Sequence, residues 1–390
     1  VLVHALHAEV QKRLKEKKLC QGNALVQRCV RPIARARHRG ILLDTEKHQS
    51  LVDVWTEERD TAKEKFIAIA SVDPESPKQL AEWLTDNLAP DDLKAWPKTG
   101  KGQLSTDKDT LKRFAHVPMV KPLLEYRHAG HRVKTWGENY RRHIESDGRI
   151  RPGFQLLGAC TGRMSSNKPN VQQLPRDPAF RSCLIAANGH KLVAADYGQI
   201  ELRTAGLLSG DNNILDAYRQ GQDLHSKIVS MVTGKPLEEV TSGERSLGKA
   251  LNFGLLYGAG AKTFRSFASA NYGLDITLEE AEQYKTQFDK SYNKLRFWQY
   301  EQHRKHQQAG EFRTVGGRRC VFKDRKRCYT DSRNYPIQGA AADLQMQAIH
   351  AVSDQLTGKG VYLVNMVHDE LIIEVVDAQV AHVMDQLVLI

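Results

Sequence analysis

Two apolar stretches of this chain lead into acidic residues that could act together in catalysis. Residues 193–195 precede Asp196, and residues 364–367 precede Asp369, 173 positions later. A strand with apolar residues on both faces does not normally end in carboxylates, and two neighbouring carboxylates repel each other unless a cation lies between them. Mg²⁺ is usually bound by one or two carboxylates together with substrate phosphates. Asp196 and Asp369 therefore indicate metal-assisted phosphoryl transfer.

Arg245, Lys249 and Phe253 follow one another at four-residue intervals in a predicted helix over residues 238–257. Four residues advance about 400° around a helix, so the three side chains share one face at intervals of about 6 Å. Two cations followed by an aromatic ring fit a nucleoside triphosphate, since Arg offers a bidentate fork to a phosphate and Lys a mobile point charge. The alternative is a helix with one basic edge and a buried Phe, which these residues alone leave open.

Composition narrows the class of protein. The chain has 390 residues, 41% hydrophobic and 26% charged, as in an ordinary soluble globular protein of roughly two to four subdomains. Its formal net charge of +11 favours a polyanionic partner such as nucleic acid, although a basic protein without such a partner is the alternative. No apolar run approaches the ~18–20 residues of a membrane span, so we expect no membrane association.

The six cysteines form no C-x-x-C pair and no Cys/His cluster with zinc spacing. We therefore expect reduced thiols in a cytosolic-type compartment. The His-rich stretch 303–306 is expected on the solvated surface. The chain begins with Val-Leu-Val rather than Met and shows no signal peptide, which indicates a fragment of a longer protein.

Local patterns predict the elements that must position these residues. Residues 40–44 predict a short strand or turn followed by a helix N-cap at Asp44, and residues 161–175 are polar and non-helical. A hairpin is predicted over 312–322, around Gly316-Gly317. Three strands are predicted over 191–195, 361–367 and 371–376, the last two around a tight turn. Further helices are predicted over 56–69, 123–140, 200–208, 278–308 and 340–356.

Three segments together resemble the motifs of a known enzyme family. Asp196-Tyr-Gly-Gln-Ile-Glu-Leu-Arg, Arg245 to Gly258 and Val367-His-Asp-Glu-Leu resemble motifs A, B and C of the family A DNA polymerases, the bacterial DNA polymerase I class. Residues 161–175, 223–225 and 334–343 also resemble the family. The order and spacing of all six segments agree over residues 25–385.

The resemblance implies an α+β multidomain fold with a right-hand architecture, in which an antiparallel-sheet palm is flanked by helical fingers and a helical thumb. Residues 50–145 would form the thumb, 146–205 and 336–390 the palm, and 206–335 the fingers. Residues 1–49 would be the lead-in from an upstream, exonuclease-side region. Relatives often have a 3′–5′ exonuclease domain there and a C-terminal tail after motif C, and we expect neither in this chain.

The reaction implied by the resemblance is template-directed attack of a primer 3′-hydroxyl on a dNTP with release of pyrophosphate, in DNA replication or repair. Two Mg²⁺ ions, for which Mn²⁺ can substitute, would stabilise the attacking and leaving oxygens. Asp196, Asp369 and the backbone carbonyl of Tyr197 would bind them, with Glu370 as a neighbour rather than a ligand. Lys249 would also be the general acid for the leaving pyrophosphate.

The resemblance implies roles for two further groups of residues. The nucleotide-binding residues would be Gln199, Glu201, His225, Arg245, Lys249, Phe253 and Tyr257. Glu201 matches the family's steric gate, which selects deoxyribose. The residues that contact primer–template DNA would be Arg163, Asn170, Gln172, Asn334, Gln338 and His368. Of these, Arg163, Asn334 and Gln338 would reach the minor groove, where every base pair offers an N3 or O2 acceptor.

Of the positions that depart from the family pattern, two carry an expectation. Gly248 stands where Ala is usual, which predicts a looser helix, at a cost of about 1 kcal/mol. Thr330 stands where relatives often have Arg, with Arg327 or Arg333 as candidate substitutes for that primer–template contact.

The implied partners are primer–template DNA and dNTPs, with the chain acting as a monomer and with replisome or processivity proteins as further partners. The implied location is the cytoplasm of a bacterial or phage-infected cell, with an organelle as the alternative. A single-subunit RNA polymerase or a reverse transcriptase is the competing enzyme, although Glu201 argues against ribonucleotides. A catalytically silent primer–template binding protein is the non-enzymatic alternative.

Overall fold

The computed structural model describes residues 2–175, 177–324, 328–358 and 360–390. The chain divides into two compact units. The larger unit comprises Val1–Gly40, Pro152–Gln173 and Ala187–Ile390, and the smaller comprises Ile41–Arg151 and Leu174–Ala186. All residues to which the sequence analysis assigns chemistry lie in the larger unit.

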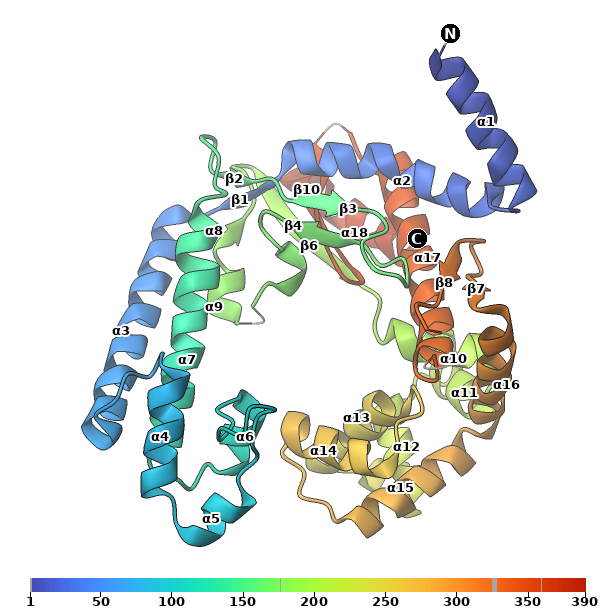
Figure 1. Ribbon diagram of the computed structural model, residues 1–390. Helices are drawn as coiled ribbons and strands as arrows, with labels where there is room; N and C mark the ends of the chain where they lie inside the picture. The colour runs from blue at the N-terminus through green and yellow to red at the C-terminus, as the bar shows by residue number, and fades with distance from the viewer. Residues whose placement is uncertain (1, 176, 325–327, 359) are drawn as a thin grey trace. The chain divides into compact units, whose positions relative to one another are not determined.

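The smaller unit is mostly helical. Its strand β1 (Ile41–Leu43) pairs antiparallel with β2 (Arg149–Ile150) and β5 (Leu184–Ile185). The Asp44 side chain then accepts a hydrogen bond from the Lys47 N–H and begins the next helix, as predicted. The helices are α3 (Thr45–Ala70), α4 (Pro77–Asn87), α5 (Pro90–Ala95), α6 (Lys108–Arg113), α7 (Val120–Arg132), the π-helical η1 (Val133–Glu138), α8 (Asn139–Arg141) and α9 (Pro178–Arg181). Helix α3 packs along α7 (Figure 1).

A three-stranded antiparallel sheet forms the centre of the larger unit. Strand β10 (Glu370–Val376) lies between β6 (His190–Asp196) and β9 (Val361–Val367), which confirms the three predicted strands. Five consecutive residues of β10 are buried, as its apolar sequence requires of a central strand. Helix α2 (Cys20–Arg39) packs against β9 and α17 (Asp331–Gln355).

Helices make up most of the rest of the larger unit. They are α1 (Leu2–Glu16), α10 (Ile200–Ser209), α11 (Asn212–Arg219), α12 (Leu224–Thr233), η3 (Leu237–Glu239), α13 (Ser242–Leu255), α14 (Ala261–Tyr272), α15 (Leu278–Ser291), α16 (Asn293–Ala309), η4 (Asp377–Gln379) and α18 (Val380–Leu389). Short hairpins are formed by β3 (Gly153–Gln155) with β4 (Ser165–Asn167) and by β7 (Glu311–Arg313) with β8 (Arg319–Val321). One 3₁₀ turn, η2, spans Val171–Gln173.

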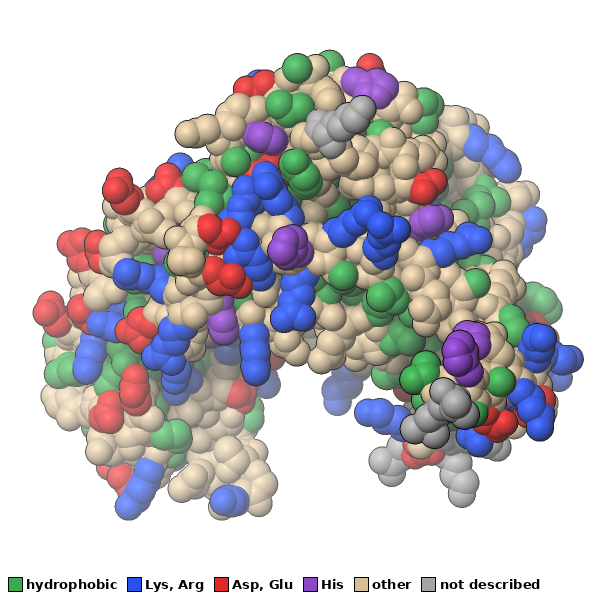
Figure 2. All heavy atoms as spheres, turned by 90° about the horizontal axis from the view of Figure 1, so that it is seen from above, with side chains coloured by type: hydrophobic (Ala, Val, Ile, Leu, Met, Phe, Trp, Pro, Cys, Tyr) green, Lys and Arg blue, Asp and Glu red, His purple; other side chains and the backbone are tan. Residues whose placement is uncertain are grey.

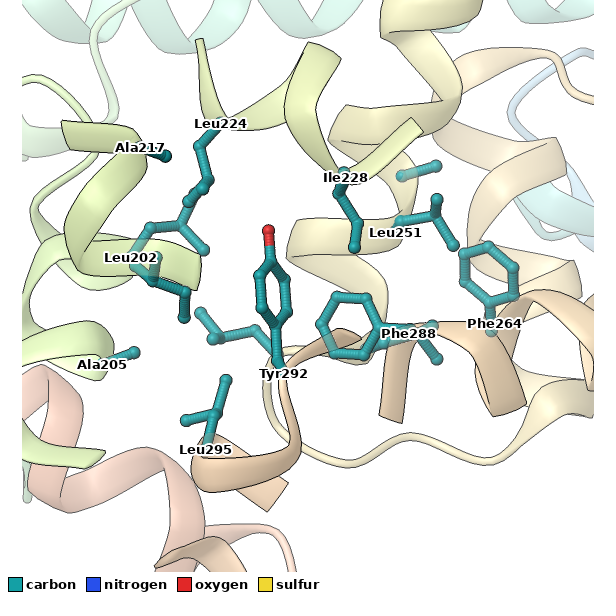
Figure 3. Close-up of a cluster of buried hydrophobic side chains, with 14 of the residues drawn as sticks. Leu202, Ala205, Ala217, Leu224, Ile228, Leu251, Phe264, Phe288, Tyr292 and Leu295 are labelled. Atoms are coloured by element: carbon teal, nitrogen blue, oxygen red, sulfur yellow. The ribbon is translucent and has the colours of Figure 1, made fainter. Parts of the chain in front are cut away.

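The prediction of one helix over 278–308 is wrong, because the chain breaks at Tyr292 between α15 and α16. The Tyr292 ring is buried in the helical core and meets Phe288 edge to face (Figure 3). The Asp211 carboxylate accepts hydrogen bonds from the N–H groups of Asn213 and Leu295, so it caps α11 and α16 together. The break is therefore specified by a distant carboxylate and by burial of an aromatic ring, without a Gly or Pro at the site.

The predicted start of the last long helix, at residue 340, is also wrong, since α17 begins at Asp331 and contains Pro336. Proline lacks the N–H that would bond to the carbonyl of Ser332, four residues earlier. His306 Nδ1 lies 3.4 Å from that carbonyl oxygen and replaces the missing donor. His306 is consequently buried rather than solvated as predicted, and burial lowers its pKa.

A buried ion pair joins the β7–β8 hairpin to α17. Arg318 Nε lies 2.5 Å from Asp343 Oδ1, and the other oxygen of Asp343 accepts the Gly316 N–H at 2.7 Å. The Arg318 guanidinium also donates to the carbonyls of Gly339 and Thr161. The Arg318–Asp343 ion pair thus holds together the hairpin turn, α17 and the loop before Arg163.

None of the described helices is long and apolar enough to cross a membrane. All six cysteines are free thiols, as their spacing indicates.

Replacing Asp343 with Ala should destabilise the larger unit by about 3–5 kcal/mol, because Arg318 would remain buried without its anion. The matched control is Glu311→Ala, which removes the partner of the neighbouring, partly exposed Arg319 and should change stability little. Urea unfolding followed by circular dichroism measures both variants. Equal losses in the two would contradict the prediction.

Candidate active site

Sheet pairing brings the two predicted metal-binding carboxylates together. Asp196 ends β6 directly opposite Glu370, the first residue of β10, and the Tyr197 N–H faces the Asp369 carbonyl oxygen at 3.5 Å. Asp369 follows His368 in the two-residue turn between β9 and β10, where His368 adopts a left-handed backbone with φ of 55°. The hairpin and the end of β6 therefore present Asp196 and Asp369 at one edge of the sheet.

The electrostatics of this pair favour a bound cation. Burial raises the pKa of Asp369, and the negative charge of Asp196 raises it further. Among the described residues, no cluster of three or more His, Cys, Asp or Glu side chains has metal-binding geometry. Two repelling carboxylates without a third His, Cys, Asp or Glu side chain beside them fit Mg²⁺, which completes its shell with water and phosphate oxygens.

Glu201 lies at the centre of a hydrogen-bonded cluster. Its carboxylate accepts hydrogen bonds from the Tyr257 hydroxyl and the Arg163 guanidinium, and Gln338 Nε2 lies 3.5 Å away. Burial raises the pKa of Tyr257 well above its usual value, and the charge of Glu201 raises it further, so the hydroxyl remains a donor. Four residues that the sequence analysis selected from separate motifs therefore meet around one carboxylate.

Arg163 connects this cluster to the carboxylate pair. It forms an ion pair with Glu201, and its positive charge partly offsets the raised pKa of Asp369. In addition, Asp196 and Glu201 lie only five residues apart, at the end of β6 and in the first turn of α10. The two groups therefore belong to one site.

The face of α13 carries Arg245, Lys249 and Phe253, as predicted, and Phe253 is 40% exposed. The helix is shorter than predicted because a capping box formed by Thr241 and Glu244 begins it at Ser242.

The sequence analysis assigned no role to Asp223, which holds Arg245 in place. Arg245 Nε and Nη2 each lie 2.9 Å from an Asp223 carboxylate oxygen. Burial acts to raise the pKa of Asp223, but hydrogen bonds from Arg245 and Ser226 outweigh it and lower the pKa to about 2. A bidentate pair therefore orients the guanidinium.

His225 is only 3% exposed and packs beneath α13. Its Nδ1 lies 3.1 Å from Asn252 Nδ2, and its ring centroid lies 5.4 Å from that of Phe253. Burial is the main cause of a lowered pKa for His225, which favours the neutral imidazole.

The packing of α13 against α12 explains why glycine occupies position 248, which helix propensity does not reveal. A Cβ atom at this position would lie 1.9 Å from the His225 carbonyl oxygen, on the backbone of α12. Since backbone cannot move aside as a side-chain end can, Gly248 allows α12 and α13 to approach closely. The expectation of a looser helix rests on helix propensity alone, which takes no account of this contact with α12.

The remaining predicted contacts occupy varied environments. Asn170 Oδ1 accepts from the Gln172 N–H and the Ser166 hydroxyl, so it stabilises its own loop. Gln199 Oε1 accepts from the Tyr218 hydroxyl at 2.8 Å. By contrast, Gln172 Nε2 and Asn334 Oδ1 are buried without a partner among the described residues, which leaves them able to bind a ligand.

Of the two arginines predicted to replace a primer–template contact at Thr330, the structure describes only Arg333. Arg327 lies outside the described residues. Arg333 is buried, with its guanidinium 3.7 Å from the centre of the Tyr329 ring. Its Nη1 approaches Gly258 so closely that a Cβ there would lie 2.2 Å away. Arg333 therefore packs against the end of the α13 segment.

Replacing Gly248 with Ala should lower stability by about 1–3 kcal/mol through overpacking, although Ala ordinarily stabilises a helix. The control is Gly243→Ala in the same helix, where the nearest atom to a new Cβ is 3.9 Å away. That variant should be neutral or gain up to about 1 kcal/mol. Hydrogen exchange of the α13 amides measures both, and stronger protection in Gly248→Ala would support the propensity argument instead.

Replacing Asp369 with Asn should raise the melting temperature near pH 8 in the absence of divalent cations. A carboxyl whose pKa is raised by folding destabilises the protein when ionised, and this effect disappears as the pH falls through about 4. The variant should also gain less stability from MgCl₂ than the wild type. Calorimetry at pH 4 and pH 8, with the exposed Glu238→Gln as control, tests this. A lower melting temperature for Asp369→Asn at pH 8 would contradict it.

Comparison with known proteins identifies the family. The family model described as DNA polymerase family A matches residues 45–389. DNA polymerase I of Aquifex aeolicus is 37% identical over 349 residues, which cover 88% of this chain and 59% of the relative. The thermostable DNA polymerase I of Thermus thermophilus is 31% identical over 400 residues, with 98% and 47% coverage. The chain thus spans about half the length of these relatives.

A solved structure agrees with the sequence comparison. The POL domain of Pol1 from M. smegmatis, in a complex with DNA primer-template and dNTP, superposes with a TM-score of 0.82 at 30% identity. The match covers 94% of this chain and 65% of that one. It confirms the predicted α+β, right-hand polymerase fold. The chain belongs to the family A DNA polymerases.

Proposed function

We propose that this chain extends the 3′ end of a primer along a DNA template by adding dNTPs, with release of pyrophosphate. The observation that carries this proposal is the single site formed by the Asp196–Asp369 pair and the Glu201 cluster, which Arg163 connects. A similar POL domain was solved with primer-template and dNTP, which supports the same ligands here.

The carboxylate pair would act on the reacting phosphate. Two Mg²⁺ ions, or Mn²⁺ in their place, would activate the primer hydroxyl and neutralise charge on the leaving oxygen. Asp196 and Asp369 are the residues that would bind them, with the Tyr197 carbonyl as a further oxygen. That carbonyl also accepts the Ile200 N–H at 3.3 Å, which leaves its second lone pair for a ligand.

The α13 face would bind the triphosphate. Arg245 and Lys249 provide positive charge along one face, and Lys249 would give a proton to the departing pyrophosphate. Phe253 is exposed enough to stack on the nucleotide. The buried, neutral His225 would contribute through a hydrogen bond rather than through charge.

The Glu201 cluster would select deoxyribose. Tyr257 and Arg163 hold the carboxylate from two sides, so Glu201 cannot swing away from a 2′-hydroxyl without losing both hydrogen bonds. Gln338 and Asn334, on α17, would contact the minor groove together with Arg163, and Gln172, Asn170 and His368 would complete the primer–template contacts. Gln199 would support the nucleotide site from the start of α10.

We assign the thumb to residues 50–145, the palm to 146–205 and 336–390, and the fingers to 206–335. This assignment follows the family motifs, with residues 1–49 as the lead-in. A monomer acting on primer–template DNA in the cytoplasm is the simplest arrangement.

Asp196→Ala and Asp369→Ala should each reduce Mg²⁺-dependent primer extension by at least about 10³-fold, equivalent to about 4 kcal/mol. Extension of a labelled primer by the wild type, both variants and the Glu238→Ala control measures this, with circular dichroism to verify folding. Normal extension by either variant would refute the mechanism. Faster extension with NTPs than with dNTPs would favour an RNA polymerase, and no extension by the wild type would favour a silent binding protein.

A further inference from the structure

Positive charge is concentrated at the start of this chain. Residues 1–40 contain ten Lys and Arg against two Glu, a net charge of +8. The other 350 residues contain 47 Lys and Arg against 44 Asp and Glu, a net charge of +3. Most of the chain's net charge of +11 therefore lies in residues 1–40, which comprise α1, α2 and their connection, outside the site described above.

Helix α2 presents much of this charge on one face. Arg28, Arg31 and Arg35 are exposed and follow at intervals of three and four residues, so they form one stripe, which we call the basic face of α2. The opposite side of the helix buries Cys29 and Ala36. Figure 2 looks onto the side of the molecule that carries α2 and shows Lys and Arg side chains gathered there.

The basic face has no internal counter-charge. Helix α2 contains no Asp or Glu, and within the described residues Arg28, Arg31 and Arg35 form no hydrogen bond or ion pair. Of the elements packed on α2, β3 and β9 contain no acidic residue. Glu9 of α1 pairs with Arg13 and the buried Asp343 of α17 with Arg318, and no described acidic residue of α1 or α17 forms an ion pair with the three arginines. Like charges at these spacings destabilise a helix, so the arrangement favours an external anion.

The helix is held firmly beneath this face. Cys29 Sγ lies 3.2 Å from the Met346 carbonyl oxygen of α17. Near the end of α2, Arg39 binds the buried Glu374 at 2.6 Å and lies 4.1 Å from the centre of the Tyr362 ring. The three exposed arginines are therefore presented by a fixed backbone, which lowers the entropy cost of binding.

We propose that the basic face of α2 binds the sugar–phosphate backbone of nucleic acid, independently of sequence and in addition to the primer end at the active site. This inference rests on the proposed function for the identity of the polyanion. Arg28 and Arg35 are separated by about 10.5 Å along the helix, a length over which duplex DNA presents about six phosphate charges. The guanidinium fork suits phosphate oxygens. The face lacks the Trp, Phe and Leu side chains by which an amphipathic helix enters a lipid surface.

The test is the salt dependence of DNA binding. Fluorescence anisotropy with a labelled primer–template, from 50 to 200 mM KCl, is measured for the wild type and for the triple variant Arg28→Gln, Arg31→Gln and Arg35→Gln. Each phosphate contact with duplex DNA contributes about 0.9 to the slope of log affinity against log salt. With three contacts removed, the ratio of the wild-type affinity to the variant affinity should therefore fall by about 40-fold between 50 and 200 mM KCl.

Two controls separate the basic face from general charge. The triple variant Lys290→Gln, Lys294→Gln and Lys305→Gln removes the same charge from exposed positions on α15 and α16 and should keep the wild-type slope. Replacing the three arginines with Lys should keep most of the wild-type slope. An unchanged slope in the Arg→Gln variant would overturn the proposal. If that variant also lost the wild type's binding to phosphatidylserine vesicles while its DNA slope stayed the same, the basic face would bind a lipid surface instead.

The same samples are assayed for primer extension at saturating DNA, where the Arg→Gln variant should match the wild type. Failure of the wild type to extend primers, together with the expected change in slope, would refute the proposed function and leave the binding surface standing.

Discussion

The pairing of β10 with β6 and β9 is the constraint on which the rest of the larger unit depends. It sets Asp196 opposite Glu370 and places Asp369 in the turn beside them. A shift of one residue would turn every side chain of β10 to the other face of the sheet. The nearly complete burial of β10 prevents this, because a slipped strand would exchange apolar contacts for the charged side chain of Glu374. Apolar packing of the strands therefore holds Asp196 and Asp369 close together although their negative charges repel each other.

The sequence predicts those parts of the fold that depend on neighbouring residues. Continuous apolar runs located β6, β9 and β10, and four-residue spacing placed Arg245, Lys249 and Phe253 on one helix face. Capping chemistry placed Asp44 at the start of α3. In each case the pattern and the interaction that it reflects lie within one helix or one strand.

Features decided by distant residues were not predictable in this way. The break at Tyr292 depends on Asp211, more than eighty residues earlier, and the early start of α17 depends on His306 replacing a hydrogen bond that Pro336 cannot make. Gly248 likewise looks unfavourable by helix propensity until the backbone of α12 is in place. The same limit applies to Asp223, whose role follows from its distance to Arg245 rather than from its own motif.

The Asp223–Arg245 pair sets a condition on the nucleotide binding proposed for α13. Asp223 keeps its charge at neutral pH, and its carboxylate also accepts the Ser226 N–H at 2.8 Å at the start of α12. It is therefore fixed to a helix end and cannot follow Arg245 toward a ligand. A triphosphate that binds Arg245 must either share the guanidinium, using the donors that Asp223 leaves free, or replace a bidentate pair already formed. Sharing retains the orientation that Asp223 provides and leaves no charge unpaired, whereas replacement would leave a partly buried carboxylate without its cation. The geometry thus favours contact of the proposed triphosphate with Nη1 of Arg245, which Asp223 leaves free, with Asp223 still in place.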